Sequence, residues 1–347
     1  MKKWSDIKTP DFLQGVGFVG HGGSDQAIRG HATISPARKS CSLRASAPAF
    51  ASLGGPCPLR LSDDPLHGLA LRRLRNIMPA FGKLCLALVL LAGMMGAGRG
   101  QVRTESVFQD PCIVFRCDEG GITRGRTDRK EMALIFTGGD FADGGAHIRN
   151  VLRDKGVKAG FFFTGDFYRS PEKKDLIRGL VADGHYLGPH SDKHLLYCDW
   201  DDRSKTLVTR DEFRADILAN TKVMEEFGIR GEDAPLFIPP YEWYNKDIAR
   251  WSRELGLILF NFTPGTSSNA DYTTPDMPEY LSSRTIWDRI WACERRDSDG
   301  FNGFIMLIHI GTDPKRTDKF YLRLGDLLDE LHERDYRPVR IDDLLRQ

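Results

Sequence analysis

The feature that most constrains the fold is an alternation of apolar runs and amphipathic stretches that starts at residue 131 and continues to the C-terminus. Continuous apolar runs joined by helical segments indicate parallel strands that are covered on both faces. With six or seven such units, the sequence predicts an α/β fold closed, or nearly closed, into a barrel. We expect strands at 132–137, 158–164, 235–238, 257–262, 303–310 and 337–341, and helices near 144–155, 171–183, 210–228, 245–255, 283–296 and 317–334.

Two of these helices begin with recognisable capping residues. Thr209 is followed three residues later by Glu212, which is the spacing of a capping box, and Asn245 precedes another helical stretch. Side-chain oxygens at such positions accept hydrogen bonds from backbone N–H groups that the first helical turn leaves unpaired. These residues support the helices expected at 210–228 and 245–255.

Charge is distributed unevenly along the chain. Residues 1–97 carry 12 Lys and Arg against 5 Asp and Glu, whereas residues 98–347 carry 37 against 43. A nucleic-acid partner usually requires a basic face, so the acidic main part argues against one. The sequence divides into an unstructured leader, a signal-like segment, a lead-in segment and one domain, at 1–77, 78–97, 98–130 and 131–347.

Residues 78–97, MPAFGKLCLALVLLAGMMGA, combine a short basic start, an apolar run and small residues at the end. This is signal-peptide architecture, and the run is too short for a comfortable membrane span. We expect translation to begin at Met78 and the protein to be exported, with no stable membrane span after cleavage near Ala97. The alternative is a buried helix behind a disordered leader.

Four cysteines follow residue 97, and two of them, Cys112 and Cys117, are close in sequence. In an exported protein such a pair can form a disulfide across a short loop. A zinc knuckle is not expected, because no second closely spaced pair of Cys or His accompanies them.

Residues that can carry chemistry follow the ends of several expected strands. In parallel α/β barrels functional groups gather where strands end and loops begin, so these residues are expected to share one site. They are Asp140, Asp143, His190, His194, Tyr241, Glu242, Asp271 and His309.

His190 and His194 lie four positions apart in GPHSDKHLLY. Two neutral imidazoles and a carboxylate, with open positions for water, commonly hold a hydrolytic divalent metal. Asp140 can supply the carboxylate. Taken alone, two histidines at this spacing can also be hydrogen-bonded surface residues.

HSDKH, PPYEWYN and IMLIHIG, in this order behind a strand that ends in acidic residues, resemble the polysaccharide deacetylase family. This is the NodB-homology domain of carbohydrate esterase family four, and the resemblance covers residues 131–345. It implies a deformed (β/α) barrel that removes N- or O-linked acetyl groups from a glycan with a divalent metal. It also implies that His190 and His194 are metal ligands.

The resemblance also assigns roles to residues of the later motifs. The backbone N–H of Tyr241 would hold the oxyanion, and His309 would act as general acid toward the leaving group. Asp271 would orient His309.

Three departures from the family pattern concern the base and its partners. The first motif reads IFTGGDFADGG, so the acids are displaced to Asp140, assigned to the metal, and Asp143, which is either the base or the N-cap of the next helix. Ile238 replaces an arginine that contacts the catalytic Asp in the family. Glu242 is a second candidate base, or it contacts sugar hydroxyls. The tryptophan-bearing Asp-Trp element is also altered around Asp271.

The sequence therefore predicts an exported, metal-dependent deacetylase of an acetylated carbohydrate, with zinc as the expected metal and cobalt, nickel or manganese as alternatives. A catalytically degenerate glycan-binding domain of the same fold is the first alternative, supported by the altered first motif. The second is a hydrolase of another non-peptide C–N bond, such as a cyclic amide.

Overall fold

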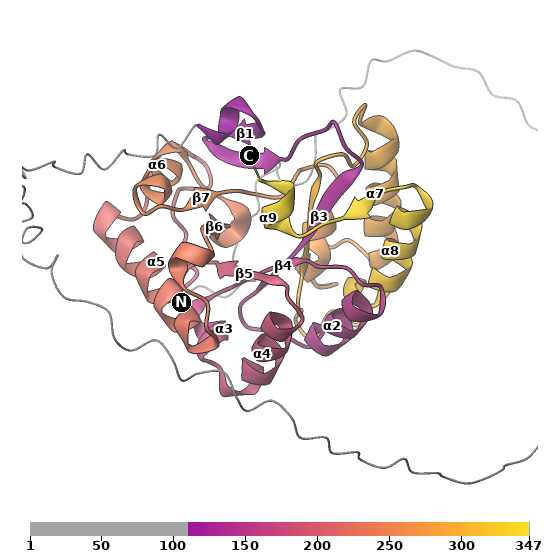
Figure 1. Cartoon of the computed structure of the whole chain (residues 1–347), viewed down its shortest axis with the longest axis horizontal. Helices are drawn as coiled ribbons and strands as arrows, with labels where there is room; N and C mark the ends of the chain where they lie inside the picture. The colour runs from indigo at the N-terminus through magenta and orange to yellow at the C-terminus, as the bar shows by residue number, and fades with distance from the viewer. Residues whose placement is uncertain (1–109, 347) are drawn as a thin grey trace, which may run out of the picture. The chain divides into compact units, whose positions relative to one another are not determined.

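The computed structural model describes residues 110–346, so the segments expected at 1–77 and 78–97 lie outside the described residues. Short strands lie at the centre with helices around them (Figure 1). The strands are β1 Arg116–Asp118, β2 Gly121–Arg124, β3 Glu131–Gly138, β4 Gly160–Phe163, β5 Tyr186–Pro189, β6 Leu236–Phe237, β7 Ile258–Leu259, β8 Ile305–His309 and β9 Arg337–Pro338. The helices are α2 Gly145–Asp154, α3 Gly165–Arg169, α4 Lys174–Ala182, α5 Arg210–Met224, α6 Lys246–Glu254, α7 Ser283–Arg296, α8 Leu324–Glu333 and α9 Ile341–Leu344.

The main sheet is parallel, with strand order β5-β4-β3-β8, and β9 pairs with the start of β3. Strand β3 is central because its apolar residues are buried on both faces. Near the end of β3, Thr137 pairs in register with His309 on β8 and with Phe162 on β4. Paired residues of adjacent strands point to the same face of a sheet, so Thr137 and His309 project together.

The remaining strands extend this sheet around an incomplete ring. Strands β6 and β7 pair in parallel, and a bridge joins Ile122 to Phe260 just after β7. The N–H of Thr263 then donates to the carbonyl of Ile305 on β8, at 2.9 Å. Within residues 110–346 no ladder joins β5 to β6, where the Tyr186 hydroxyl accepts from the N–H of Leu236 instead. The fold is therefore α/β, as predicted, with a barrel that is deformed and not closed.

Aromatic residues fill the interior of the sheet. Phe136, Phe161, Phe162 and Phe163 are all fully buried, and the rings of Phe136 and Phe161 stack with centroids 5.0 Å apart. Burying each such side chain stabilises the fold by roughly 1.5–3 kcal/mol. This packing holds the carboxyl ends of β3, β4 and β8 rigidly beside one another.

All six strands and all six helices expected from the sequence are present, although most are shorter than expected. The capping box of Thr209 and Glu212 is confirmed, and the Asn245 side chain accepts from the N–H of Ile248. The sequence analysis did not anticipate the strands β1, β2 and β5 or the short helices α3 and α9. Strand β5 is only four residues long and includes Gly188 and Pro189, so it lacks the apolar run that would reveal it.

The lead-in segment expected at 98–130 contributes to the fold from residue 110. Cys112 and Cys117 form the predicted disulfide, with Cα atoms 5.5 Å apart. Arg124 on β2 is fully buried and pairs with Asp297 at 2.6 Å, while its other nitrogens donate to the carbonyls of Gly300 and Asn302. These contacts tie β2 to the loop before β8.

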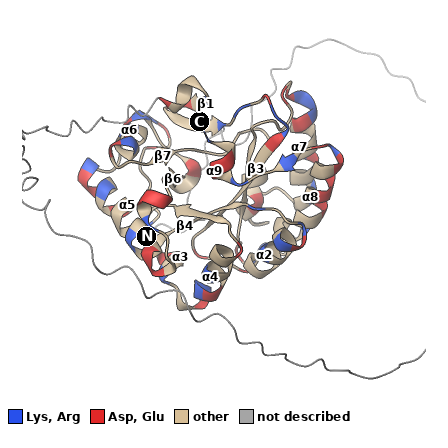
Figure 2. Cartoon of the chain, in the orientation of Figure 1, with Lys and Arg blue, Asp and Glu red and all other residues tan. Residues whose placement is uncertain are grey.

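The outer helix faces carry both charge signs side by side, most visibly on α5, α7 and α8 (Figure 2). Pairs such as Arg284 with Asp288, at 3.0 Å, follow the i,i+4 spacing of a solvated helix face. Among residues 110–346, no helix combines the length and the apolar character needed to cross a bilayer.

Candidate active site

The site lies where the sheet strands end. His190 follows β5 directly, and Tyr241 and Glu242 lie in a turn of 3₁₀ helix, Pro240–Glu242, that follows β6. His309 is the last residue of β8, and Asp271 belongs to the 3₁₀ helix Ser268–Tyr272. The structure thus brings together six of the eight predicted residues. Five come from the four stretches of chain named above, and His194 lies in the loop after β5.

Two neighbours fix the position of His190, which is only 3% exposed. Its Nδ1 lies 2.9 Å from the carbonyl of Ile238, and its backbone N–H donates to Oδ1 of Asn220 on α5, at 2.8 Å. The Ile238 contact assigns the proton to Nδ1 and leaves the lone pair on Nε2. Burial lowers the pKa of His190 to about 4. The contact with the Ile238 carbonyl acts to raise this pKa, whereas the charge of His309 lowers it. The ring is therefore neutral at ordinary pH.

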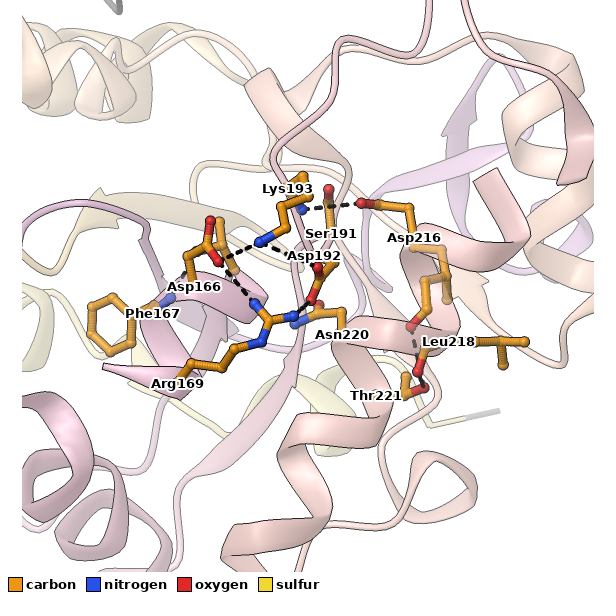
Figure 3. A network of polar contacts seen from close by, with 12 residues as sticks. Asp166, Phe167, Arg169, Ser191, Asp192, Lys193, Asp216, Leu218, Asn220 and Thr221 are labelled. Carbon is orange, nitrogen blue, oxygen red and sulfur yellow. Dashed lines mark hydrogen bonds and ion pairs between the residues drawn. The ribbon is translucent and has the colours of Figure 1, made fainter. Parts of the chain in front are cut away.

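The loop between the two histidines has a strained backbone held by helices α3 and α5 (Figure 3). Ser191 and His194 have φ values of 72° and 54°, and non-glycine residues in this left-handed region cost of order 1–2 kcal/mol each. Asp216 accepts from the N–H of Lys193 at 3.0 Å. Arg169 pairs with Asp192, which is buried. These contacts maintain the loop geometry that places the two imidazoles together.

His194 lies between His190 and Tyr241. The two imidazole centroids are 5.1 Å apart, and the Tyr241 ring lies 4.3 Å from the His194 ring. Burial, and then the charges of His190 and His309, lower the pKa of His194 well below its ordinary value. Trp200 also contacts Tyr241, with ring centroids 5.7 Å apart.

Glu242 places a carboxylate deep in the site. It is 8% exposed, and its Oε1 lies 4.0 Å from Nε2 of His190. Burial raises the pKa of Glu242 to about 7, although the charge of His309 opposes this and that of Asp271 adds to it. The residue has a φ of 53° and follows Tyr241 at 60°, so the backbone is strained where it delivers this side chain.

His309 and Asp271 form a tightly coupled pair. The Nδ1 of His309 donates to Oδ1 of Asp271 at 2.6 Å, and the N–H of His309 donates to Oδ2 at 3.0 Å. Burial alone would lower the pKa of His309, but the charge and hydrogen bond of Asp271, together with Glu242, outweigh it and raise that pKa. Asp271 therefore stabilises the protonated form of His309.

Asp140 lies on the loop after β3, beyond the strand end at Gly138, and its side chain is exposed. Burial raises the pKa of the Tyr241 phenol, and the charge of Asp140 raises it further. Within residues 110–346, no three His, Cys, Asp or Glu side chains are grouped to hold a metal ion. The ligand group of Asp140, His190 and His194 therefore stays a prediction.

Asp143 does not cap helix α2, whose N-cap is Gly144 without a side-chain hydrogen bond. Its carboxylate instead accepts from the N–H of Thr312 and the hydroxyl of Tyr321, both at 2.8 Å, and pairs with Lys319 at 2.9 Å. Burial acts to raise the pKa of Asp143, but these donors outweigh it and lower the pKa. A carboxylate stabilised in this way is poorly suited to accept a proton, and its contacts tie the loop after β3 to the loop after β8.

The donor set fits a divalent metal in part. The imidazoles of His190 and His194 lie side by side and are neutral, as metal ligation requires. The carboxylate nearest to Nε2 of His190 comes from Glu242 rather than from the loop after β3.

Thr137 is a site residue that the sequence analysis did not identify. Its hydroxyl is buried and has no hydrogen-bond partner among the described residues, and its Cα pairs in register with that of His309. A buried hydroxyl without a partner costs of order 1–3 kcal/mol, which a bound molecule would relieve. The only signal in the sequence was its position at the end of β3.

A family model described as polysaccharide deacetylase matches residues 124–259, which carry β3, both site histidines, Tyr241 and Glu242. This segment of the chain matches the polysaccharide deacetylase family. Peptidoglycan-N-acetylglucosamine deacetylase of Bacillus cereus is 24% identical over 143 residues, which are 41% of this chain and 47% of that protein. An uncharacterized 30.6 kDa protein of Geobacillus stearothermophilus is 26% identical over 121 residues, which are 35% and 41%. The chain thus spans less than half the length of these two relatives.

Solved structures of polysaccharide deacetylase relatives share the fold. A CE4 family pseudoenzyme from Bacillus anthracis aligns with a TM-score of 0.52 at 18% identity, covering 66% of this chain and 70% of that one. A peptidoglycan N-acetylglucosamine deacetylase in complex with a hydroxamate aligns with a TM-score of 0.51 at 18% identity, covering 64% and 91%. At this level of identity the likeness establishes the fold alone.

Proposed function

We propose that this polysaccharide deacetylase-family protein is a hydrolase that removes acetyl groups from an acetylated glycan. The observation that carries the proposal is the pair of opposed ionisable groups in the site, the Glu242 carboxylate and the His309–Asp271 dyad. A buried carboxylate whose pKa is raised beside a histidine held by a second carboxylate is an arrangement suited to acid–base catalysis. The Bacillus cereus relative is named for N-acetylglucosamine in peptidoglycan, which makes an N-acetyl amino sugar the first substrate to test.

In this mechanism Glu242 accepts the proton of a water that attacks the acetyl carbonyl carbon. The backbone N–H of Tyr241 stabilises the oxyanion of the tetrahedral intermediate. His309 then donates a proton from Nε2 to the departing nitrogen or oxygen, while Asp271 holds its Nδ1. These steps require an ionised Glu242 and a protonated His309, and the charge and hydrogen bond of Asp271 favour the protonated form of His309.

We also propose that His190 and His194 hold a divalent ion, zinc first, with cobalt, nickel or manganese as alternatives. When bound, such an ion lowers the pKa of a water and polarises a carbonyl. The disulfide Cys112–Cys117 supports an exported protein, because disulfides persist in oxidising compartments.

The test measures acetate release and bound metal together. The metal-loaded protein is incubated with β-1,4-linked N-acetylglucosamine oligomers and with O-acetylated xylan, and metal content is measured by mass spectrometry. His190→Ala should lose both bound metal and acetate release, whereas the matched control His332→Ala, on the exposed face of α8, should retain both. Unchanged metal content and unchanged acetate release in His190→Ala would refute the proposal.

The end of β3 favours a second candidate, a glycan-binding protein without catalysis. Thr137 and Gly138 provide no carboxylate there, and no three His, Cys, Asp or Glu side chains among residues 110–346 are grouped to hold a metal ion. A binding protein would retain affinity for the oligomers and release no acetate with any of the four metals. A hydrolase of another C–N bond would instead release product from cyclic amides or formamides in the same assay.

A further inference from the structure

A cavity of about 190 Å³ opens beside the proposed acid–base pair. Tyr272 links the two, since its ring lines the cavity and its centroid lies 5.4 Å from that of His309. The residues that line the cavity include Ser267, Asn269, Tyr272, Glu279, Tyr280 and Arg289.

Asn269 lines this cavity and carries an acceptor that no described residue satisfies. The residue is 7% exposed, and its Oδ1 is buried without a hydrogen-bond partner among the described residues. A buried amide oxygen in this state costs of order 1–3 kcal/mol unless a donor reaches it. Since Asn269 lines the cavity, a hydroxyl or amide N–H of a bound molecule can supply that donor.

Arg289 and Glu279 add one charge of each sign. The guanidinium of Arg289 reaches from α7 and donates to Oγ of Ser267 at 3.1 Å. Within residues 110–346, no ion pair is found for either Arg289 or Glu279. Opposite charges in one cavity of this size suit a neutral ligand with several hydroxyl groups better than an ion.

Arg316 fixes one wall of the cavity through Thr273 and Leu281. Arg316 is fully buried, and its guanidinium donates to the carbonyls of Thr273 at 2.7 Å and Leu281 at 3.0 Å. It also lies 5.2 Å from the centroid of the Tyr280 ring. The segment that carries Glu279 and Tyr280 is therefore held at both ends, and the cavity is formed before any ligand binds.

We propose that this cavity is a subsite for one sugar ring of the glycan, the ring adjacent to the one that loses its acetyl group. Tyr272 and Tyr280 offer aromatic surfaces to the apolar faces of a pyranose. Asn269 accepts from a hydroxyl or an acetamido N–H, and Arg289 and Glu279 bind hydroxyls at the edge of the ring. The role of the neighbouring ring rests on the proposed function, whereas binding of a sugar here does not.

The test compares the N-acetylglucosamine monomer with its β-1,4-linked tetramer. Asn269→Ala and Arg289→Ala should each lower the ratio of kcat/KM for the tetramer to that for the monomer by about tenfold, through KM. The dissociation constant of the tetramer, measured by calorimetry, should rise by the same factor. The matched control Arg295→Ala removes an exposed arginine from the same helix and should leave ratio and affinity unchanged.

The two proposals fail in different ways. An unchanged ratio and affinity in both folded cavity variants, with acetate still released, would overturn the subsite and leave the deacetylase in place. Tetramer binding that depends on Asn269 without acetate release would overturn the deacetylase and retain the subsite. Circular dichroism establishes that each variant is folded, and Tyr280→Ala replaces either variant that is not.

Discussion

Replacing Glu242 by Gln is expected to stabilise the folded protein while it abolishes acetate release. The pKa of this carboxyl rises from 4.5 to about 7 on folding, chiefly through burial. At 1.36 kcal/mol for each tenfold change in proton affinity, the buried carboxylate destabilises the native state by about 3 kcal/mol above pH 7. Gln has the same shape and carries no charge, and both side chains meet the same φ of 53°, so backbone strain cancels in the comparison.

The sign of the pH dependence follows from the raised pKa. The folded wild-type protein binds the Glu242 proton more tightly than the unfolded chain does, so the stability from this group is complete below pH 4.5. That stability is lost as the pH rises through about 7. The gain from Glu242→Gln should therefore be close to zero at pH 4 and reach about 3 kcal/mol at pH 8.5.

Urea unfolding of the metal-free protein, followed by circular dichroism at both pH values, measures this difference. Glu333→Gln on the exposed face of α8 is the matched control and should change stability by less than about 0.5 kcal/mol. Equal unfolding free energies for the wild type and Glu242→Gln at pH 8.5 would show that Glu242 is not the buried, proton-retaining carboxyl described above.

Three further predictions concern the groups around the site. Asp271→Asn should lower the pKa of His309, because it removes the charge that raises it, and a ¹H–¹³C NMR titration that finds the same pKa would contradict the dyad. Asn220→Ala leaves the buried N–H of His190 without its acceptor and should reduce the unfolding free energy by about 1–3 kcal/mol in urea, so a loss below 0.5 kcal/mol would count against it. Replacing Cys112 and Cys117 together by Ser opens a short loop and should cost about 2 kcal/mol, measured in the same way under non-reducing conditions; no change would mean that the bond is absent.

The fold was predictable from the sequence wherever an element is long and patterned. Strand β3 is apolar along its length and helix α5 begins with a capping box, so local chemistry agrees with the final structure. Strand β5 escaped the strand prediction because Gly188 and Pro189 make up half of it and its stability comes from β4 beside it. Such an element exists through tertiary contacts that no local pattern records.

The residues of the candidate site were predictable from the sequence, but the contacts that each of them makes were not. His190, His194, His309 and Asp271 come together because parallel strands end at one edge, a rule of the fold that needs no coordinates. The position of Asp140 relative to the imidazoles was not predictable, since it depends on where β3 stops pairing. The burial of the Glu242 side chain depends on two successive residues with positive φ. The residue types Tyr and Glu do not predict that conformation.

The hydrogen bonds that hold the loop between His190 and His194 affect how the site binds and releases an ion or an inhibitor. Asn220 and Asp216, both on α5, accept hydrogen bonds from the backbone N–H groups of His190 and Lys193. An incoming ion or inhibitor would find both imidazoles already aligned, with no chain ordering left to slow its capture. Removal by a chelator should then be reversible at ambient temperature, with recovery limited by diffusion and dehydration of the ion rather than by refolding.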